Sequence, residues 1–448
     1  MIAEILSTGD EVRTGAVADT NAAFIAQSLE GEGIEVTRHQ CVGDDVATIA
    51  AVMVEISRRA AVALVTGGLG PTADDVTAEA AARALGVSLA PDAAAMAVVE
   101  RYFARRGRPV TATNRKQGIL PRGASCLDNP LGSAPGFAFT LGNCRFFCLP
   151  GVPAEMRAMI SDVVLPDIRQ RMGGDLGARR VRAITTFGIP ESTMADRLAG
   201  FEAAFEGVRL GLRAHFPEIH VRLYFSEADP EDLARREPAA VDWVRQRIEP
   251  FVVSDDGLSL AEVVGRDLKA QAASLAVAES CTGGLISSWI TDVAGSSDYF
   301  RLGAVTYTNA AKEAILGVSA ETLKQYGAVS RQTVMEMAAG ARRCTDATYG
   351  LATSGVAGPT GGSAQKPVGS LCLGIATAQG VRAAAYRFGA NWRRANKVAF
   401  AAAGLNLLRI VIGQGLVADL EDRAKPIYAE RLELDDGVNQ APGDEAPK

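Results

Sequence analysis

One segment decides the fold class of this chain, because it runs from an apolar strand through a glycine-rich loop into a helix. It reads Ala61-Val62-Ala63-Leu64-Val65-Thr66-Gly67-Gly68-Leu69-Gly70-Pro71-Thr72-Ala73-Asp74-Asp75. The apolar run predicts a buried strand over Ala61–Thr66, and the pattern that follows predicts a helix over Asp75–Leu85. A strand, a loop and a helix in this order form the repeating unit of a parallel α/β sheet.

The same alternation extends on both sides of this segment. Further strands are expected at Ile2–Leu6, Ile34–Cys41 and Arg145–Leu149, and helices at Asn21–Leu29, at Thr48–Ser57 and after Pro153. We therefore expect a parallel α/β domain over residues 1–172, followed by a linker over Arg171–Arg180. A small α+β module is expected over residues 178–255, with strands at Val181–Phe187, His220–Phe225 and Phe251–Val253 and helices at Ser192–Phe205 and Glu231–Ile248.

A third unit, over residues 257–415, alternates strands and helices again and is expected to be α/β. Its strands are expected at Leu275–Ala278, Gly303–Tyr307, Tyr349–Ser354, Ser370–Ala376 and Val381–Phe388. Residues 424–448 are polar and are expected to be disordered.

The composition limits the partners and the compartment. The net charge of −6 gives the chain no general attraction for nucleic acid or anionic lipid. The seven cysteines are odd in number, scattered and without a CxxC pair, which is typical of reduced thiols in the cytoplasm. The N-terminus lacks a signal-peptide pattern, and no apolar run is expected to reach the roughly 18 residues that span a membrane.

The segment Ala278-Glu279-Ser280-Cys281-Thr282-Gly283-Gly284 ends the first strand of the third unit. A turn into a helix here would place the Ser280 hydroxyl at a helix N-terminus and leave the N–H groups of Cys281, Thr282 and Gly283 free for an oxyanion. Ser280 and Thr282 could instead only cap the helix. Cys281 is a rival nucleophile, because thiolates are intrinsically more reactive than hydroxyls.

A nucleophile in the third unit needs a base other than histidine. The three histidines of the chain, His39, His215 and His220, all lie outside this unit. Lysine is the known substitute, and Lys312 follows a strand in Thr306-Tyr307-Thr308-Asn309-Ala310-Ala311-Lys312. Partial burial or a neighbouring cation can lower its pKa to roughly 7–8, as a base near neutral pH requires. A solvated surface lysine is the alternative.

These segments resemble the C-terminal domain of the CinA family (competence/damage-inducible protein A). The match covers Ala278–Gly284, Val305–Lys312, Gly327–Ser330, Ser354–Gly362 and Lys366–Gly369, with Ala310 where relatives often carry Glu. The resemblance implies a nicotinamide mononucleotide deamidase without a cofactor, in which Ser280 attacks the carboxamide and Lys312 and Tyr307 assist proton transfer. We place its substrate site at Cys281, Thr282, Gly283, Gly284, Ser354, Gly355, Gly358, Gly361 and Gly362. The last five belong to a glycine-rich loop that suits a phosphate or a sugar, although such a loop is often a simple turn.

Two N-terminal loops, Ser7–Glu11 and Thr66–Asp75, follow strands whose carboxyl ends would meet at one edge of the sheet. With Asp19–Asn21, Asn129–Gly136 and Leu149–Met156 they resemble the molybdopterin-binding (MoaB/Mog-like) domain of the CinA family. Phosphate is expected at Gly9, Gly67, Gly68, Gly70 and Thr72. A divalent metal (Mg²⁺, Mn²⁺ or Co²⁺) is expected at Asp10, Asp74 and Asp75, although each aspartate alone is more simply a helix cap or turn former.

The resemblance implies a MoaB/Mog-like parallel-sheet domain, a KH-like α+β connector and an α/β deamidase domain, in a homodimer. It also implies a second activity, metal-dependent hydrolysis of ADP-ribose by the N-terminal domain. The alternatives are a pterin- or nucleotide-binding protein with an inactive C-terminal domain, and a regulatory interaction protein. Neither nucleic acid nor a membrane is expected as a partner, since the connector has no GxxG loop and the chain is acidic.

Overall fold

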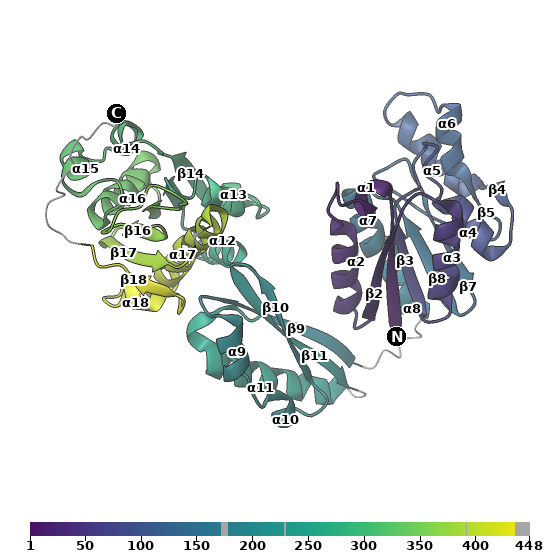
Figure 1. The fold of residues 1–448 in the computed structure, drawn as a ribbon, viewed down its shortest axis with the longest axis horizontal. Helices are drawn as coiled ribbons and strands as arrows, with labels where there is room; N and C mark the ends of the chain where they lie inside the picture. Colours follow the sequence, from purple (N-terminus) through teal and green to yellow (C-terminus); the bar gives the residue numbers. More distant parts are fainter. Residues whose placement is uncertain (172–177, 228–229, 391, 435–448) are drawn as a thin grey trace. The chain divides into compact units, whose positions relative to one another are not determined.

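The computed structural model describes residues 1–171, 178–227, 230–390 and 392–434 (Figure 1). The chain divides into two compact units. The first is Met1–Val181 with Tyr224–Ala234, and the second is Arg182–Leu223 with Arg235–Lys448. Most of the expected linker, Arg171–Arg180, lies outside the described residues.

The N-terminal domain is a sheet between two layers of helices (Figure 1). The strand order is β2 (Glu35–Val42), β1 (Ile2–Thr8), β3 (Val62–Thr66), β8 (Cys144–Leu149), β7 (Gly136–Leu141) and β6 (Ser125–Leu127). The first four strands are parallel, and β7 and β6 are antiparallel additions. One face packs against α2 (Thr20–Gly31), α7 (Pro153–Met159) and α8 (Leu165–Arg171), and the other against α3 (Val46–Ser57), α4 (Thr77–Leu85) and α5 (Ala93–Ala104). Helices on both faces explain why β3 is buried throughout and apolar up to Thr66.

The connector is an antiparallel sheet with helices on one side (Figure 1). The strand order is β10 (Arg209–His215), β11 (Glu218–Glu227), β9 (Ala178–Phe187) and β12 (Val252–Ser254), and the helices are α9 (Glu191–Arg197), α10 (Phe201–Ala204) and α11 (Pro230–Ile248). Strand β10 was not expected from the sequence. The single helix expected over Ser192–Phe205 is wrong, because Gly200 is left-handed and separates α9 from α10.

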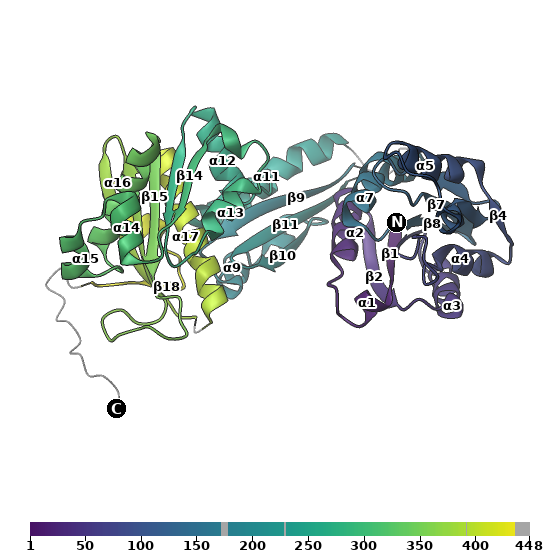
Figure 2. The same ribbon diagram turned by 90° about the horizontal axis from the view of Figure 1, so that it is seen from above.

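The C-terminal domain repeats the three-layer plan around a six-stranded sheet (Figure 2). The order is β14 (Phe300–Val305), β13 (Leu275–Glu279), β15 (Tyr349–Gly355), β16 (Ser370–Thr377), β17 (Gly380–Phe388) and β18 (Ala429–Arg431), of which the first three are parallel. Helices α12 (Leu260–Ala270), α13 (Leu285–Thr291) and α17 (Arg393–Gln414) cover one face. Helices α14 (Asn309–Leu316), α15 (Ala320–Tyr326) and α16 (Arg331–Thr345) cover the other.

Two expectations for the C-terminal region need correction. Residues 424–448 are not disordered as a whole, since β18 pairs with β17, while residues 435–448 lie outside the described part of the chain. Among the described residues, one helix, α17, is also long and apolar enough to cross a membrane. Its charged residues interrupt the apolar run, and most of the helix is buried in the domain core, so it is a core helix here.

Candidate functional site

The register of three parallel strands places Ser280 between two other segments. Glu279, the last residue of β13, pairs with Val305 of β14 and Thr353 of β15. The pairing continues past the strand ends, because Thr306 N donates to Glu279 O at 2.8 Å and Ser280 N donates to Thr353 O at 3.0 Å. All three segments therefore leave the sheet together at its carboxyl edge, where open α/β sheets bind ligands.

Lys312 reaches the Ser280 hydroxyl from the first half of α14. Its Nζ lies 3.2 Å from Ser280 Oγ and donates to Thr306 O at 2.8 Å. Lys312 is 1% exposed, so the surface-lysine alternative does not hold. Burial lowers the pKa of Lys312, and the nearby Cys281 thiol only partly opposes this shift. A buried amine with a lowered pKa, within hydrogen-bond distance of a hydroxyl, can accept the proton of that hydroxyl.

The turn after Ser280 differs from the sequence expectation. Helix α13 starts at Leu285 with Gly284 as its cap, so Ser280 neither lies at a helix N-terminus nor caps one. The amide of Gly283 donates back to Ser280 O at 3.1 Å and is not available to an oxyanion. The amides of Cys281 and Thr282 remain as candidate oxyanion donors. Gly283 and Gly284 have φ of 62° and 89°, a left-handed pair that other residues adopt only with strain.

Glu279 is a structural residue that the sequence reasoning missed. Its carboxylate is fully buried and accepts hydrogen bonds from Gly284 N at 3.0 Å, Ile286 N at 3.2 Å, Ser287 N at 2.9 Å and Ser287 Oγ at 2.7 Å. It therefore provides the capping that was considered for Ser280 and Thr282. The signal in the sequence was a glutamate at the end of an apolar strand. A carboxylate in such a buried position needs hydrogen-bond partners, so its place predicts a structural role.

Cys281 is an unfavourable nucleophile in this environment. The residue is buried, and burial raises the pKa of its thiol to about 12. The thiolate needed for attack is therefore scarce near neutral pH. Thr282 is also buried, and its hydroxyl shares a 2.8 Å hydrogen bond with Thr353 Oγ1, which ties the turn to β15.

A pocket of about 220 Å³ opens beside Ser280. Its lining residues are Ser280, Cys281, Tyr307, Lys312, Ala328, Val329, Ser354, Gly355, Ala357 and Arg393. Of the expected substrate-site residues, three line this pocket: Cys281, Ser354 and Gly355. Six do not: Thr282, Gly283, Gly284, Gly358, Gly361 and Gly362. Only the start of the glycine-rich loop reaches the pocket. Ser354 Oγ donates to Ala328 O at 2.7 Å and fastens that part to the neighbouring segment.

Arg393, at the start of α17, is the second residue that the sequence reasoning missed. Its Nη2 donates to the Tyr307 hydroxyl at 2.9 Å, and its Nη1 donates to Gly358 O at 2.8 Å. Tyr307 lines the pocket but is 59% exposed, so this bond holds its ring at the pocket mouth. A guanidinium at this position can also bind an anionic group of a ligand.

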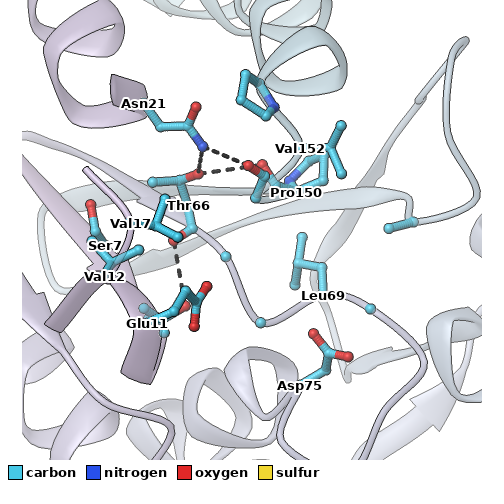
Figure 3. A pocket seen from close by; sticks show the side chains of 18 of the residues that line it. Ser7, Glu11, Val12, Val17, Asn21, Thr66, Leu69, Asp75, Pro150 and Val152 are labelled. Carbon is cyan, nitrogen blue, oxygen red and sulfur yellow. Dashed lines mark hydrogen bonds between the residues drawn. The ribbon is translucent and has the colours of Figure 1, made fainter. Parts of the chain in front are cut away.

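The N-terminal domain has its own pocket, of about 450 Å³, at the carboxyl ends of β1 and β3 (Figure 3). Of the residues expected to bind phosphate, Gly9, Gly67, Gly68 and Gly70 line it, and Thr72 does not. Figure 3 shows Asn21, Thr66 and Pro150 on one wall with Asp75 opposite. Asn21 Nδ2 donates to Thr66 Oγ1 at 3.1 Å and to Gly151 O at 2.8 Å, which joins the start of α2 to the end of β3 and to the segment after β8.

The three aspartates expected to hold a metal do not converge. Asp74 and Asp75 line the N-terminal pocket, whereas Asp10 lies outside its lining and pairs with Arg13 at 2.9 Å. Asp75 accepts a 2.8 Å hydrogen bond from Thr72 N, as a turn-forming aspartate does. Among the described residues, no three His, Cys, Asp or Glu side chains gather in a way that could hold a metal. A preformed three-aspartate site is therefore not what the structure presents.

The N-terminal pocket is strongly acidic. Its charged lining residues are Glu11, Asp19, Asp44, Asp74, Asp75 and Glu155, and no lysine or arginine of the described part of the chain lines it. Asp44, which the sequence reasoning did not select, has its pKa raised by burial and by the carboxylates of Asp10, Glu11 and Asp74. A phosphate group would be repelled from this pocket unless a cation accompanied it.

Fold and site together define a class: three-module α/β proteins with a buried serine–lysine pair at the carboxyl edge of the last sheet. Residues 258–412 match the family model described as the CinA C-terminal domain. Residues 181–253 match the damage-inducible protein CinA KH domain, and residues 4–170 a probable molybdopterin binding domain. The chain belongs to the CinA family.

Relatives support this assignment over most of the chain. A CinA-like protein of Desulfosudis oleivorans is 49% identical over 409 residues, which cover 91% of this chain and 99% of the relative. A CinA-like protein of Geobacter sulfurreducens is 42% identical over 404 residues, covering 90% and 97%. The solved competence/damage inducible protein CihA from Agrobacterium tumefaciens is 43% identical, with a TM-score of 0.34, and covers 35% of this chain and 94% of its own. The family models and the two CinA-like relatives confirm the expected family, and the domain layout with its sheets confirms the expected fold class.

Replacement of Glu279 by Gln should destabilise the C-terminal domain. The NH₂ group of the glutamine would face backbone N–H groups that now donate to the carboxylate. Leaving these N–H groups without an acceptor should lower the free energy of unfolding by about 1–3 kcal/mol. Calorimetry should show a lower unfolding temperature for that domain, whereas Glu313→Gln, on the exposed side of α14, should leave it unchanged. Equal unfolding temperatures for the two variants would contradict the capping role.

Proposed function

We propose that the C-terminal site deamidates nicotinamide mononucleotide, releasing ammonia and nicotinate mononucleotide. The observation that supports this most directly is the 3.2 Å separation of Lys312 Nζ and Ser280 Oγ inside a pocket. Because the domain contains no histidine, this pair is its available combination of nucleophile and base. A carboxamide needs such a pair, together with an oxyanion site and a proton donor for the leaving ammonia.

In the proposed mechanism, neutral Lys312 takes the hydroxyl proton as Ser280 Oγ forms a bond to the carboxamide carbon. The resulting oxyanion is stabilised by the amides of Cys281 and Thr282. Protonated Lys312 then gives its proton to the amide nitrogen as the C–N bond breaks, and ammonia leaves an acyl-serine ester. Water, deprotonated by the same lysine, hydrolyses the ester and restores the hydroxyl. Tyr307 has its hydroxyl held by Arg393 and assists proton transfer at the pocket mouth.

Arg393 supports a nucleotide as the substrate. Its guanidinium lines the pocket, and its hydrogen bonds go to the Tyr307 hydroxyl and a carbonyl, so its charge is not neutralised by those contacts. A mononucleotide phosphate fits such a group, because guanidinium and phosphate form paired charged hydrogen bonds. An inactive C-terminal domain is the weaker alternative, since a buried lysine without function would only reduce stability.

For the N-terminal pocket we propose the hydrolysis of ADP-ribose. The glycines at the ends of β1 and β3 give its backbone close access to a pyrophosphate. The carboxylates of its lining would repel that group, so we propose that ADP-ribose enters together with a divalent cation. Binding of a pterin or nucleotide without hydrolysis is the alternative.

We also propose that the protein works as a homodimer in the cytoplasm. All seven cysteines are free thiols, which suits a reducing compartment. Light scattering on the purified chain tests the oligomeric state, and a monomer at micromolar concentration would contradict the proposal.

Ser280→Ala should lower ammonia release from nicotinamide mononucleotide on the order of a thousandfold or more, because the covalent nucleophile is lost. Cys281→Ala is the matched control, since its thiol lines the same pocket and should contribute little. A coupled ammonia assay measures both variants. The assignment fails if Cys281→Ala abolishes turnover or if Ser280→Ala retains it.

The pH dependence of deamidation should follow the protonation of Lys312. Burial lowers the pKa of Lys312 from 10.5. The value of kcat/KM should therefore rise with pH to a plateau, and the midpoint of this rise should lie below pH 10.5. Lys312→Arg keeps its proton at every accessible pH and should be inactive throughout. A midpoint at or above 10.5, measured on the wild type, would exclude Lys312 as the base.

ADP-ribose hydrolysis should disappear in a chelator and return with Mg²⁺, Mn²⁺ or Co²⁺. Asp74→Asn, in the pocket lining, should reduce it about tenfold or more through the loss of a charged interaction. Asp10 lies outside the lining, so Asp10→Asn should reduce ADP-ribose hydrolysis less than Asp74→Asn does. Phosphate release after phosphatase treatment of the products measures the activity, and chelator-resistant hydrolysis would argue against the cation.

A further inference from the structure

A third pocket, of about 610 Å³, lies within the second compact unit, between the connector and the C-terminal domain. It is lined from α11 and β12 on the connector side, and from α12, α17 and α18 (Leu420–Ala424) on the other side. Direct contacts join the two modules, since Leu260 N donates to Glu218 Oε1 at 2.9 Å and Ile427 N donates to Gly188 O at 2.7 Å. The pocket shares no lining residue with the two sites described above.

Four arginines line this third pocket, and three of them have a carboxylate partner. Arg245 pairs with Asp255 at 3.5 Å, and Arg266 pairs with Asp267 at 3.0 Å. Arg423 pairs with Asp419 at 2.8 Å. These pairs are partly exposed, and within each pair the aspartate neutralises the charge of the arginine.

Arg409, on α17, is the fourth arginine and differs from the others. Its Nε and Nη2 donate to Asn406 Oδ1 at 3.2 and 2.9 Å, and among the described residues no carboxylate lies within ion-pair distance of it. Burial lowers the pKa of Arg409, and the carboxylates of Asp267 and Glu249, which also line this pocket, oppose that shift without forming an ion pair with Arg409. Asn406 is itself buried and donates to Ala424 O at 3.4 Å. The guanidinium is thus held in a fixed position without a direct counter-ion.

We propose that the third pocket binds a phosphate-bearing small molecule, with Arg409 receiving its phosphoryl oxygens. The fork of an arginine offers five N–H donors, and Asn406 occupies only one edge. A half-buried positive charge that has lost hydration is stabilised by an anion, which the described chain does not supply within ion-pair distance. The volume lies in the roughly 300–1,000 Å³ range of small-molecule sites, so a nucleotide fits. This proposal does not depend on the activities proposed above.

Calorimetric titration of the full chain with AMP, inorganic phosphate and adenosine tests the proposal. AMP should show a binding event that Arg409→Gln weakens about tenfold or more, as expected for a lost charged hydrogen bond. If the phosphoryl group alone is enough for binding, the affinity for inorganic phosphate should depend on Arg409 in the same way. Adenosine, which has no phosphoryl group, should show no binding that depends on Arg409. Arg301→Gln, an exposed arginine on β14, is the matched control and should bind like the wild type.

Equal AMP affinity and stoichiometry in the wild type and Arg409→Gln would overturn the proposal, as would adenosine binding that depends on Arg409. The unfolding temperature of each variant is measured alongside. If Arg409→Gln does not fold, Arg409→Lys replaces it, because lysine keeps the charge but loses the planar fork. An AMP affinity unchanged in Arg409→Lys would then overturn the proposed contact.

Discussion

The contact between Lys312 and Ser280 depends on a backbone constraint, the parallel register of β13 with β14 and β15. That register carries Ser280 and Thr306 out of the sheet side by side. The carbonyl of Thr306 then holds the lysine nitrogen from one side while the serine hydroxyl meets it from the other. A one-residue shift in the pairing register of these strands would turn the side chains to the opposite face of the sheet and separate Lys312 from Ser280.

Burial then gives the constrained groups their chemical character. The same dry environment that lowers the pKa of Lys312 raises that of the Cys281 thiol, so it favours a lysine base and disfavours a cysteine nucleophile. Glu279 is the buried charge that the fold satisfies completely, with backbone and hydroxyl donors of the following turn. Its role is structural, and it lets a tight glycine turn follow directly after Ser280.

The pockets share an architectural rule but differ in charge. The N-terminal and C-terminal sites both lie at the carboxyl edge of parallel strands, as open α/β sheets favour. The first is lined by carboxylates and would admit a phosphate only with a cation, whereas the second offers Arg393. The third pocket lies elsewhere, between modules, and Arg409 gives it a cationic group without a direct counter-ion.

The sequence by itself determined the α/β layers, the family and the choice of Ser280 and Lys312 as candidates, because apolar periodicity and motifs are local properties of the chain. Tertiary structure alone decided which expected residues meet. Gly361 and Gly362 lie away from the pocket, Asp10 pairs with Arg13, and Arg393 arrives from a distant helix. The reason is that strand register, helix starts and side-chain partners are set by contacts between segments far apart in sequence, which no local pattern encodes.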